Sequence, residues 1–208
     1  YPYLKKKTEK LQKEEKQIIF KNVKALFIYR ICGVIQTNTD NILMSIFVGT
    51  IYVGYYSNYL LLVNAIVTIL GLVFNNLKAS IGNMLYEKDF TLEEKEKIFW
   101  ILEFVNFWLV SFIAICFVCL FQDFITLFFG TEYVLDIPVV IALTVNFYTS
   151  HIRQNIWVFR ETIGIFHETR HITMVTTVLN LFISIILGKR FGILGIIMGT
   201  VISRMIYA

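Results

Sequence analysis

Long apolar runs separated by short polar segments dominate the pattern of this chain. A helix rises about 1.5 Å per residue, so about 20 mostly apolar residues are needed to cross a hydrocarbon core of about 30 Å. We find six candidate stretches, near residues 25–48, 54–84, 98–121, 136–165, 172–187 and 192–208. The pattern therefore predicts an all-α, polytopic membrane protein with six transmembrane helices, the last of them truncated.

Composition and charge support this class. The chain is 57% hydrophobic and 16% charged, and its mean hydropathy is +0.67, outside the range usual for a soluble domain. It does not start with Met and it ends inside an apolar run, so we expect a fragment of a longer protein. The cysteines Cys32, Cys116 and Cys119 all lie in apolar runs, which favours buried hydrophobic roles over a redox or zinc site.

The basic residues predict an orientation. Residues 1–24 form a Lys-rich, helix-favouring segment, which we interpret as a cytoplasmic basic linker or amphipathic segment ahead of a six-helix lobe at 25–208. Lysines also collect between the second and third spans, whereas the loops on the other side hold only Lys189 and Arg190. Because positive loops stay in the cytoplasm, the first segment should lie inside.

The third span differs from the others because it is almost wholly apolar. Glu103 and Asn106 are its polar exceptions, so we expect it to face lipid. Thr91 and Glu94 have the spacing of a capping box, which predicts a helix start ahead of this span.

Polar residues inside the other spans follow helical spacing. The first span places Arg30, Gly33, Thr37, Asn38, Asp40, Asn41 and Ser45 on one broad arc, the second aligns Ser57, Asn64, Thr68, Gly71, Asn75, Lys78 and Gly82, and the fourth aligns Asn146, Arg153, Trp157, Arg160 and Gly164. Such polar lines can simply hold helices together, and for the Asn, Thr, Ser and Gly positions that alternative stays open. A cation at mid-membrane costs about 3 kcal/mol on insertion scales, so Arg30, Lys78 and Arg153 favour a water-filled cavity that accepts an anion.

A short motif points to a different chemistry. His167-Glu168-Thr169-Arg170-His171 fits the HExxH pattern of zinc hydrolases. The match falls in the predicted loop between the fourth and fifth spans, whereas a zinc protease needs both histidines on one helical turn and a third ligand. We therefore interpret it as a coincidence, and we expect no enzyme activity, no bound metal and no cofactor.

Three segments carry a resemblance to a known family: "ALFIYRICGVIQTNTDNILMSIFVGTIYVGYYSNYLLL", "NIWVFRETIGIF" and "FGILGIIMGTVIS". They resemble the second half of bacterial Wzx-type polysaccharide flippases of the multidrug/oligosaccharidyl-lipid/polysaccharide exporter superfamily. The resemblance implies one lobe of a two-lobed, alternating-access transporter in the bacterial cell membrane. It also implies that an N-terminal lobe is missing and that the substrate is an undecaprenyl-pyrophosphate-linked oligosaccharide.

Site residues follow from this implied function. We expect Arg30, Lys78 and Arg153 to hold the diphosphate, Asn41, Asn64 and Asn75 to meet sugar hydroxyls, and Trp157 to stack on a sugar ring. Asp40 is a candidate for binding a coupling proton or sodium ion, with structural neutralisation of Arg30 as the alternative. Arg160 and Arg204 are expected near the cytoplasmic end, where they can snorkel.

Other functions stay open. A multidrug exporter of the same superfamily would favour an acidic cavity, and the third class is a membrane scaffold or an intramembrane hydrolase. We expect contacts with the lipid bilayer and with no nucleic acid.

Overall fold

The structure is a computed structural model, and it describes residues 13–87, 90–164 and 170–206. All regular elements in this part of the chain are helical, as predicted: α1 (Lys13–Phe47), α2 (Thr50–Tyr86), α3 (Leu92–Phe128), the short 3₁₀ helix η2 (Thr131–Tyr133), α4 (Ile137–His151), α5 (Gln154–Ile163) and α6 (Arg170–Met205). Three of them, α2, α3 and α6, are long and apolar enough to cross a membrane. The chain is therefore all-α with helices of membrane-spanning character.

Helix α1 joins two segments that the sequence analysis separated at residues 24 and 25. It begins at Lys13 and continues without a break to Phe47. The Lys-rich segment and the first apolar stretch are therefore one helix, while residues 1–12 of the predicted linker lie outside the described part. The predicted start of α3 is confirmed, because Thr91 and Glu94 form a capping box at its N-terminus.

The fourth predicted span is not one continuous helix. Helix α4 has 15 residues and α5 has 10, and the backbone between them departs from helical geometry at Arg153. The Nδ2 of Asn106 on α3 donates to the carbonyl oxygens of His151 and Ile152, at 3.2 and 2.7 Å. These bonds satisfy carbonyl groups that the interrupted helix leaves unpaired, so a side chain from a neighbouring helix stabilises the break.

Helix α6 is a hairpin of two antiparallel legs, residues 170–191 and 193–205. Gly192 lies between them with φ 59° and ψ −133°, which is not helical. Asn180 and Ser184 on the first leg donate to Thr200 and Ile196 on the second. By length and composition α6 counts as one apolar helix, but because it turns back at Gly192 it is not one straight rod.

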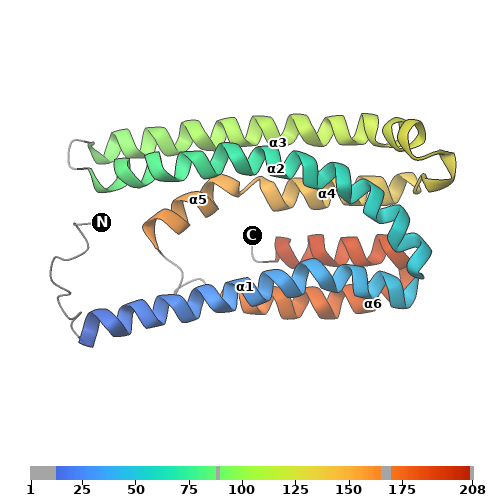
Figure 1. Cartoon of the computed structure of the whole chain (residues 1–208), viewed down its shortest axis with the longest axis horizontal. Coiled ribbons are helices and arrows are strands. Elements are labelled where there is room, and N and C mark those ends of the chain that lie inside the picture. The colour runs from blue at the N-terminus through green and yellow to red at the C-terminus, as the bar shows by residue number, and fades with distance from the viewer. Residues whose placement is uncertain (1–12, 88–89, 165–169, 207–208) are drawn as a thin grey trace, which may run out of the picture.

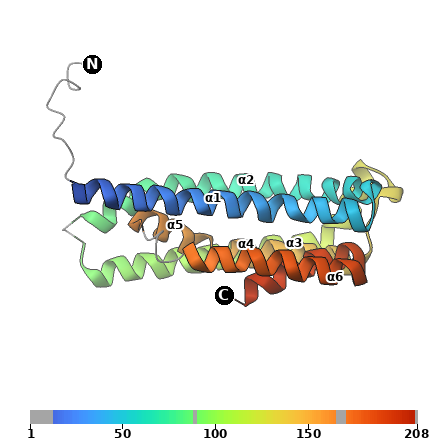
Figure 2. The same ribbon diagram turned by 90° about the horizontal axis from the view of Figure 1, so that it is seen from below.

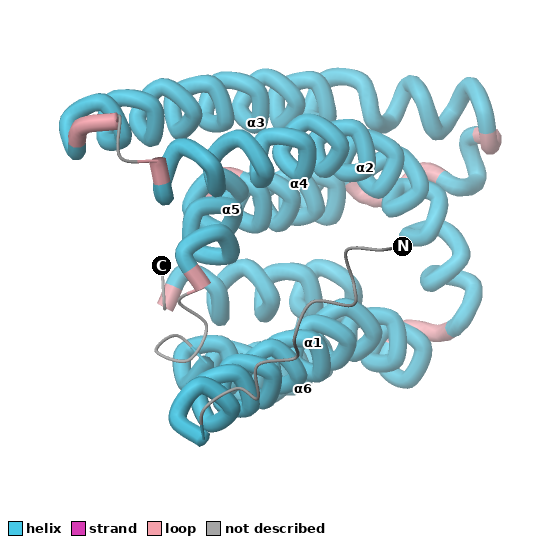
Figure 3. Tube along the Cα trace, turned by 60° about the vertical axis from the view of Figure 1, so that its left-hand side comes forward, coloured by secondary structure: helices cyan, strands magenta, loops and turns pink. Residues whose placement is uncertain are grey.

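The helices run roughly side by side along the long axis of the molecule (Figure 1). The α1–α2 turn, the segment from the end of α3 to the start of α4 and the turn within α6 lie at one end, while the start of α1, the end of α2 and the start of α3 lie at the other. Gly49, Gly130 and Gly192 have positive φ values in the segments at the first of these ends. Seen from below, α1 and α2 form one layer, and α3, α4 and α6 form a second (Figure 2). Figure 3 shows α1 paired with α6 and set apart from the group of α2, α3, α4 and α5.

Two apolar clusters explain this shape. The larger cluster draws on every long helix near the glycine turns and includes Met44, Tyr59, Phe121, Leu143 and Ile196. The smaller one joins α2 to α5, with Phe74, Ile81, Met84, Val158 and Phe159. The N-terminal half of α1 belongs to neither cluster. The bundle is therefore tightly packed at the end with the glycine turns and open between α1 and α5.

Candidate anion-binding groove

An open groove of about 470 Å³ lies between α1 and α5, and we call it the α1–α5 groove. It is lined by Leu26, Tyr29, Arg30, Gly33, Val34, Thr37 and Asn38 from α1 and by Trp157, Arg160 and Glu161 from α5. Helical spacing explains the α1 set, since positions 26, 30, 33 and 37 share one face. Thr37 and Asn38 donate to the carbonyls of Gly33 and Val34 in the preceding turn, so their donor groups are satisfied within α1.

Aromatic rings hold Arg160 in this groove. The guanidinium carbon lies 3.7 Å from the ring centroid of Trp157 and 4.7 Å from that of Tyr29. The two rings are themselves in edge contact, with centroids 6.1 Å apart. Such a stack fixes the plane of the guanidinium and stabilises its charge. Arg160 therefore lines the groove.

Lys78 of α2 does not line the groove, but it forms an ion pair with Glu161, which does. Its Nζ lies 2.5 Å from Oε2 of Glu161, and this is the one ion pair that joins residues of the described ranges. The pair connects α2 to α5, and both side chains are partly exposed, at 35% and 43%. Lys78 therefore has a carboxylate partner in Glu161, and Arg160 is hydrogen-bonded to Tyr29 and interacts electrostatically with the same Glu161 at longer range.

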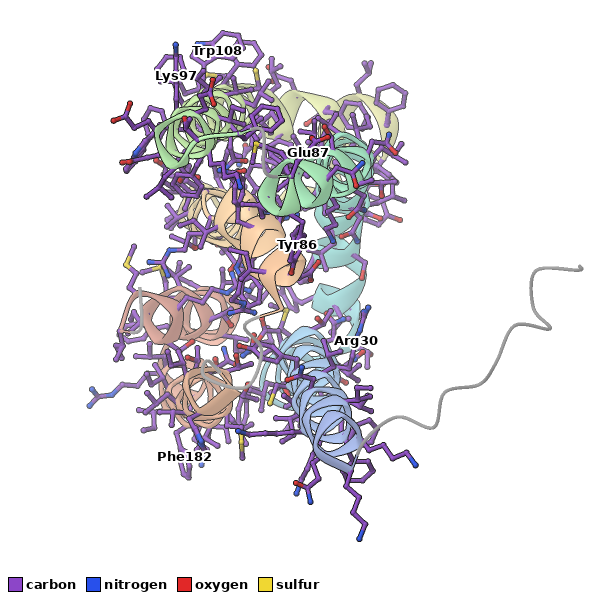
Figure 4. All side chains as sticks on the ribbon, turned by 90° about the vertical axis from the view of Figure 1, so that its left-hand side faces the viewer. Arg30, Tyr86, Glu87, Lys97, Trp108 and Phe182 are labelled. Atoms are coloured by element: carbon purple, nitrogen blue, oxygen red, sulfur yellow. The ribbon has the colours of Figure 1, made fainter. Side chains whose placement is uncertain are left out.

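The other predicted substrate-binding residues do not line this groove. Asn64 and Asn75 are exposed on α2, Asn41 is half-buried on α1, and Arg153 is half-buried at the start of α5. The structure thus brings Arg30 and Trp157 together and adds Tyr29 and Arg160. Viewed from the end where α1 begins, Arg30 lies on the side shared by α1 and α2, away from Trp108 and Phe182 on the outer edges (Figure 4).

Asp40 is placed differently from the prediction. It was grouped with Arg30 on one arc, but it is 8% exposed and turned toward α6. Its two carboxylate oxygens accept from the hydroxyl of Thr200 at 3.1 and 3.0 Å, and Asn180 donates to that hydroxyl at 2.8 Å. Asp40 lies about 80° around the helix from Arg30 and about 15 Å farther along its axis, so the two side chains face different neighbours.

Arg204 supplies the cation nearest to this buried carboxylate, and it does not snorkel as expected. Its Nη1 donates to Oδ1 and the carbonyl oxygen of Asn146, at 2.6 and 3.3 Å, and to the hydroxyl of Ser150. It also interacts electrostatically with Asp40. The cluster of Asp40, Thr200, Asn180, Arg204 and Asn146 therefore joins α1, α4 and both legs of α6. Asn146 and Ser150 are four residues apart and so share one face of α4, a spacing that could have indicated this cluster.

The third helix packs against the bundle on one face and is exposed on the other. Trp100, Phe104, Trp108, Phe112 and Ile115 are exposed along one face. The opposite face is buried, and it carries both polar residues inward. Asn106 is fully buried, and Glu103 accepts from Asn155 at the start of α5. Polar residues in an apolar helix thus mark its packed side.

The HExxH motif lies mostly outside the described residues. Helix α6 begins at Arg170, so His171 lies in its first turn, while His167 and Glu168 fall in the segment that is not described. Within the described ranges, no group of three or more His, Cys, Asp or Glu side chains is placed to hold a metal ion.

No family model, curated protein or solved structure matches this chain. The resemblance to polysaccharide flippases therefore stays a prediction from the sequence.

Proposed function

We propose that this chain forms the C-terminal lobe of a transporter that exports lipid-linked oligosaccharide across a bacterial cell membrane by alternating access. The observation that carries the proposal is the α1–α5 groove, which two arginines, Arg30 and Arg160, line together with a single described carboxylate, that of Glu161. Charges in membrane helices are costly, and they mark substrate pathways when they line a hydrated cavity.

Pyrophosphate is the anion that this groove suits best. A diphosphate carries at least two negative charges and cannot cross hydrocarbon unaided, whereas guanidinium groups can replace its hydration. The lipid tail can stay in the bilayer while the head group moves. Among the other predicted ligands, Asn64 and Asn75 are exposed on α2, where they could meet sugar hydroxyls of the same substrate.

Six crossings of the membrane are part of the proposal. In this arrangement α1, α2 and α3 each cross once, α4 and α5 cross together, and the legs of α6 make the last two crossings. The exposed polar faces of α1 and α2 would then border the cavity that the N-terminal lobe closes. This accounts for polar side chains such as Thr37 and Thr68 that are exposed in the single lobe.

We assign ion coupling to Asp40. A buried carboxylate that joins α1 to both legs of α6 can change the packing of those helices when it gains a proton or a sodium ion. Asp40→Asn should preserve the bond from Thr200 but remove the charge. We expect glycan export that no longer responds to a proton or sodium gradient, measured in vesicles with each gradient imposed separately. A gradient response equal to that of the wild type would remove Asp40 from this role.

The transport proposal is tested in cells that lack the gene. Lipid-linked oligosaccharide should accumulate on the cytoplasmic leaflet, and the intact gene should restore export. Normal surface polysaccharide in the deleted cells would defeat the proposal. Loss of resistance to cationic drugs, with normal polysaccharide, would instead indicate a multidrug exporter.

Residue variants then test the site in the same cells. Arg30→Ala should abolish complementation while the protein remains in the membrane, since Arg30 is a groove cation. Arg190→Ala is the matched control, because Arg190 is exposed at the opposite end of the bundle. Full complementation by Arg30→Ala would exclude the groove from transport.

A further inference from the structure

The helices form two groups that are joined unevenly. Helix α1 packs mainly on α6, and Gln36 donates to the hydroxyl of Thr177 across that pair, at 2.8 Å. Helix α5 packs mainly on α2, where the smaller apolar cluster and the Lys78–Glu161 ion pair hold it. The larger cluster joins both groups near the glycine turns. Among the described residues none from α1 or α6 belongs to the smaller cluster, so toward the other end the two groups do not share an apolar core.

Three side chains link the two groups at that other end. Tyr29 of α1 lies in edge contact with Trp157 of α5, with ring centroids 6.1 Å apart. The guanidinium carbon of Arg160 lies 3.7 Å from the ring centroid of Trp157 and 4.7 Å from that of Tyr29, and the guanidinium donates a hydrogen bond to Tyr29. Because α1 and α5 are not among the closely packed helix pairs, this link is a stack of side chains and not helix-on-helix packing.

Opposing effects of similar size act on this stack. Two rings over one guanidinium stabilise its charge by cation–π attraction. The Nε of Arg160, however, is buried and has no hydrogen-bond partner within the described part of the protein, and a buried donor without a partner is destabilising. Separation of α1 from α5 would break the ring contacts but would return this Nε to water. The two effects offset each other, so the stack can open and close reversibly.

From these features we infer that the stack of Tyr29, Trp157 and Arg160 is a releasable latch between the α1–α6 pair and the group of α2, α3, α4 and α5. When the latch opens, the two groups separate at the end where α1 begins and stay joined near the glycine turns, so the α1–α5 groove widens. This goes beyond the proposed function, because it concerns a movement within one lobe and holds for any ligand that enters the groove.

Distances between spin labels test the latch. In a background without the native cysteines, Lys24→Cys on α1 and Ser80→Cys on α2 place one label at an exposed position in each group. Pulsed EPR in nanodiscs should show a main distance and a minor, longer one. Tyr29→Leu removes one ring and its hydroxyl, so the fraction with the longer distance should rise about fivefold, the order expected when one cation–π contact is lost.

Controls separate release of the latch from general loosening. Trp157→Leu removes the other ring and should act like Tyr29→Leu, which gives a second measurement if one variant does not fold. Trp108→Leu is the matched control, because Trp108 is exposed on the outer edge of α3 (Figure 4) and should leave the distances unchanged. Labels at Ile51→Cys on α2 and Lys189→Cys on α6 join the two groups at the end with the glycine turns and should keep one distance in every variant. Thermal unfolding checks that each bundle is intact.

The outcomes decide the inference in either direction. A rise in the longer distance that is confined to Tyr29→Leu and Trp157→Leu, and to the label pair at the open end, would support the latch. Distance distributions equal to that of the wild type in both variants would show that the stack does not hold the two groups together. A wild-type protein with a single narrow distance would show that the stack does not open. An equal rise in Trp108→Leu, or a longer distance at the glycine-turn end as well, would indicate general loosening and would also overturn the latch.

Discussion

The charged residues inside the bundle have two different surroundings. Arg30, Arg160 and the Lys78–Glu161 pair lie in or beside an open groove, where water can reach them. Asp40 lies in the packed interior, where Thr200 and Arg204 offset the cost of burying its charge. The groove residues are placed to bind a ligand reversibly. Asp40 is placed where a change in its charge would alter the packing of the helices.

Glu161 limits the positive charge of the groove. Glu161→Gln removes one negative charge and frees Lys78, so we expect affinity for pyrophosphate, the anion proposed for the groove, to rise about threefold, within the range of exposed ion pairs. The gain should shrink at high salt because the groove is open to screening. Titration at low and high ionic strength measures both effects.

Glu132→Gln is the control for this change, since Glu132 is exposed on η2 at the other end of the molecule. It should leave affinity unchanged. An equal gain in both variants would show that net charge alone, and not the groove, attracts the ligand.

The helical spacing of polar residues predicted which faces of the helices are polar. It could not predict which residues of other helices those side chains contact. Arg30 and Trp157 were expected in the site and do share the groove. Arg160 was expected to snorkel because its position near the end of a span says nothing about Tyr29, which comes from another helix. Asp40 was misplaced because a broad arc on one helix can face two neighbours.

At the scale of helices, side chains join α3 to the break between α4 and α5, and Asn106 is the one that bonds the carbonyls at the break itself. Asn106→Ala should remove both bonds to the carbonyls of His151 and Ile152 and leave those acceptors unpaired. We expect a loss of about 1–3 kcal/mol in the free energy of unfolding. Thermal or denaturant unfolding in detergent micelles measures it.

The exposed residue Asn76 on α2 provides the comparison for Asn106. Asn76→Ala should change stability by less than about 0.5 kcal/mol. If Asn106→Ala were equally mild, the break would be set by the α4 and α5 sequences themselves and not by α3.

The hairpin of α6 depends on small residues between its legs. A Cβ on Gly195 would lie 2.0 Å from the carbonyl oxygen of Leu187, so Gly195→Ala should force the legs apart and cost about 1–3 kcal/mol. Gly54→Ala is the control, because a Cβ there meets nothing within 4 Å. Unfolding in micelles compares the two, and a neutral Gly195→Ala would mean that the legs do not pack closely.

Apolar periodicity predicted most helices because burial in lipid or in a core needs the same pattern. It predicted the gap between residues 187 and 192, which the structure places at the turn around Gly192. It could not predict the break at Arg153, since Asn106 lies 46 residues from Ile152 in the chain. Contacts over that distance do not appear in local hydropathy.

At the scale of the whole molecule, basic residues separate toward the two ends of the bundle. Lys13, Lys16, Lys21 and Lys24 lie in the first turns of α1, and Lys95 and Lys97 lie in the first turns of α3 at the same end (Figure 1). Lys189 and Arg190 lie at the turn of α6, at the opposite end. The end richer in lysine should face the cytoplasm.

Cysteine labelling tests this orientation. In a background in which Cys32, Cys116 and Cys119 are replaced by Ala, Lys97→Cys and Lys189→Cys each place one thiol at an exposed position. A membrane-impermeant maleimide should label the cysteine at 189 in intact spheroplasts, and the cysteine at 97 only after permeabilisation. The reverse pattern would invert the lobe, and labelling of both in intact spheroplasts would put the two ends on one side and exclude a bundle that spans the membrane. In the predicted orientation the α1–α5 groove lies toward the cytoplasmic end, which is the side from which the proposed transport would take its substrate.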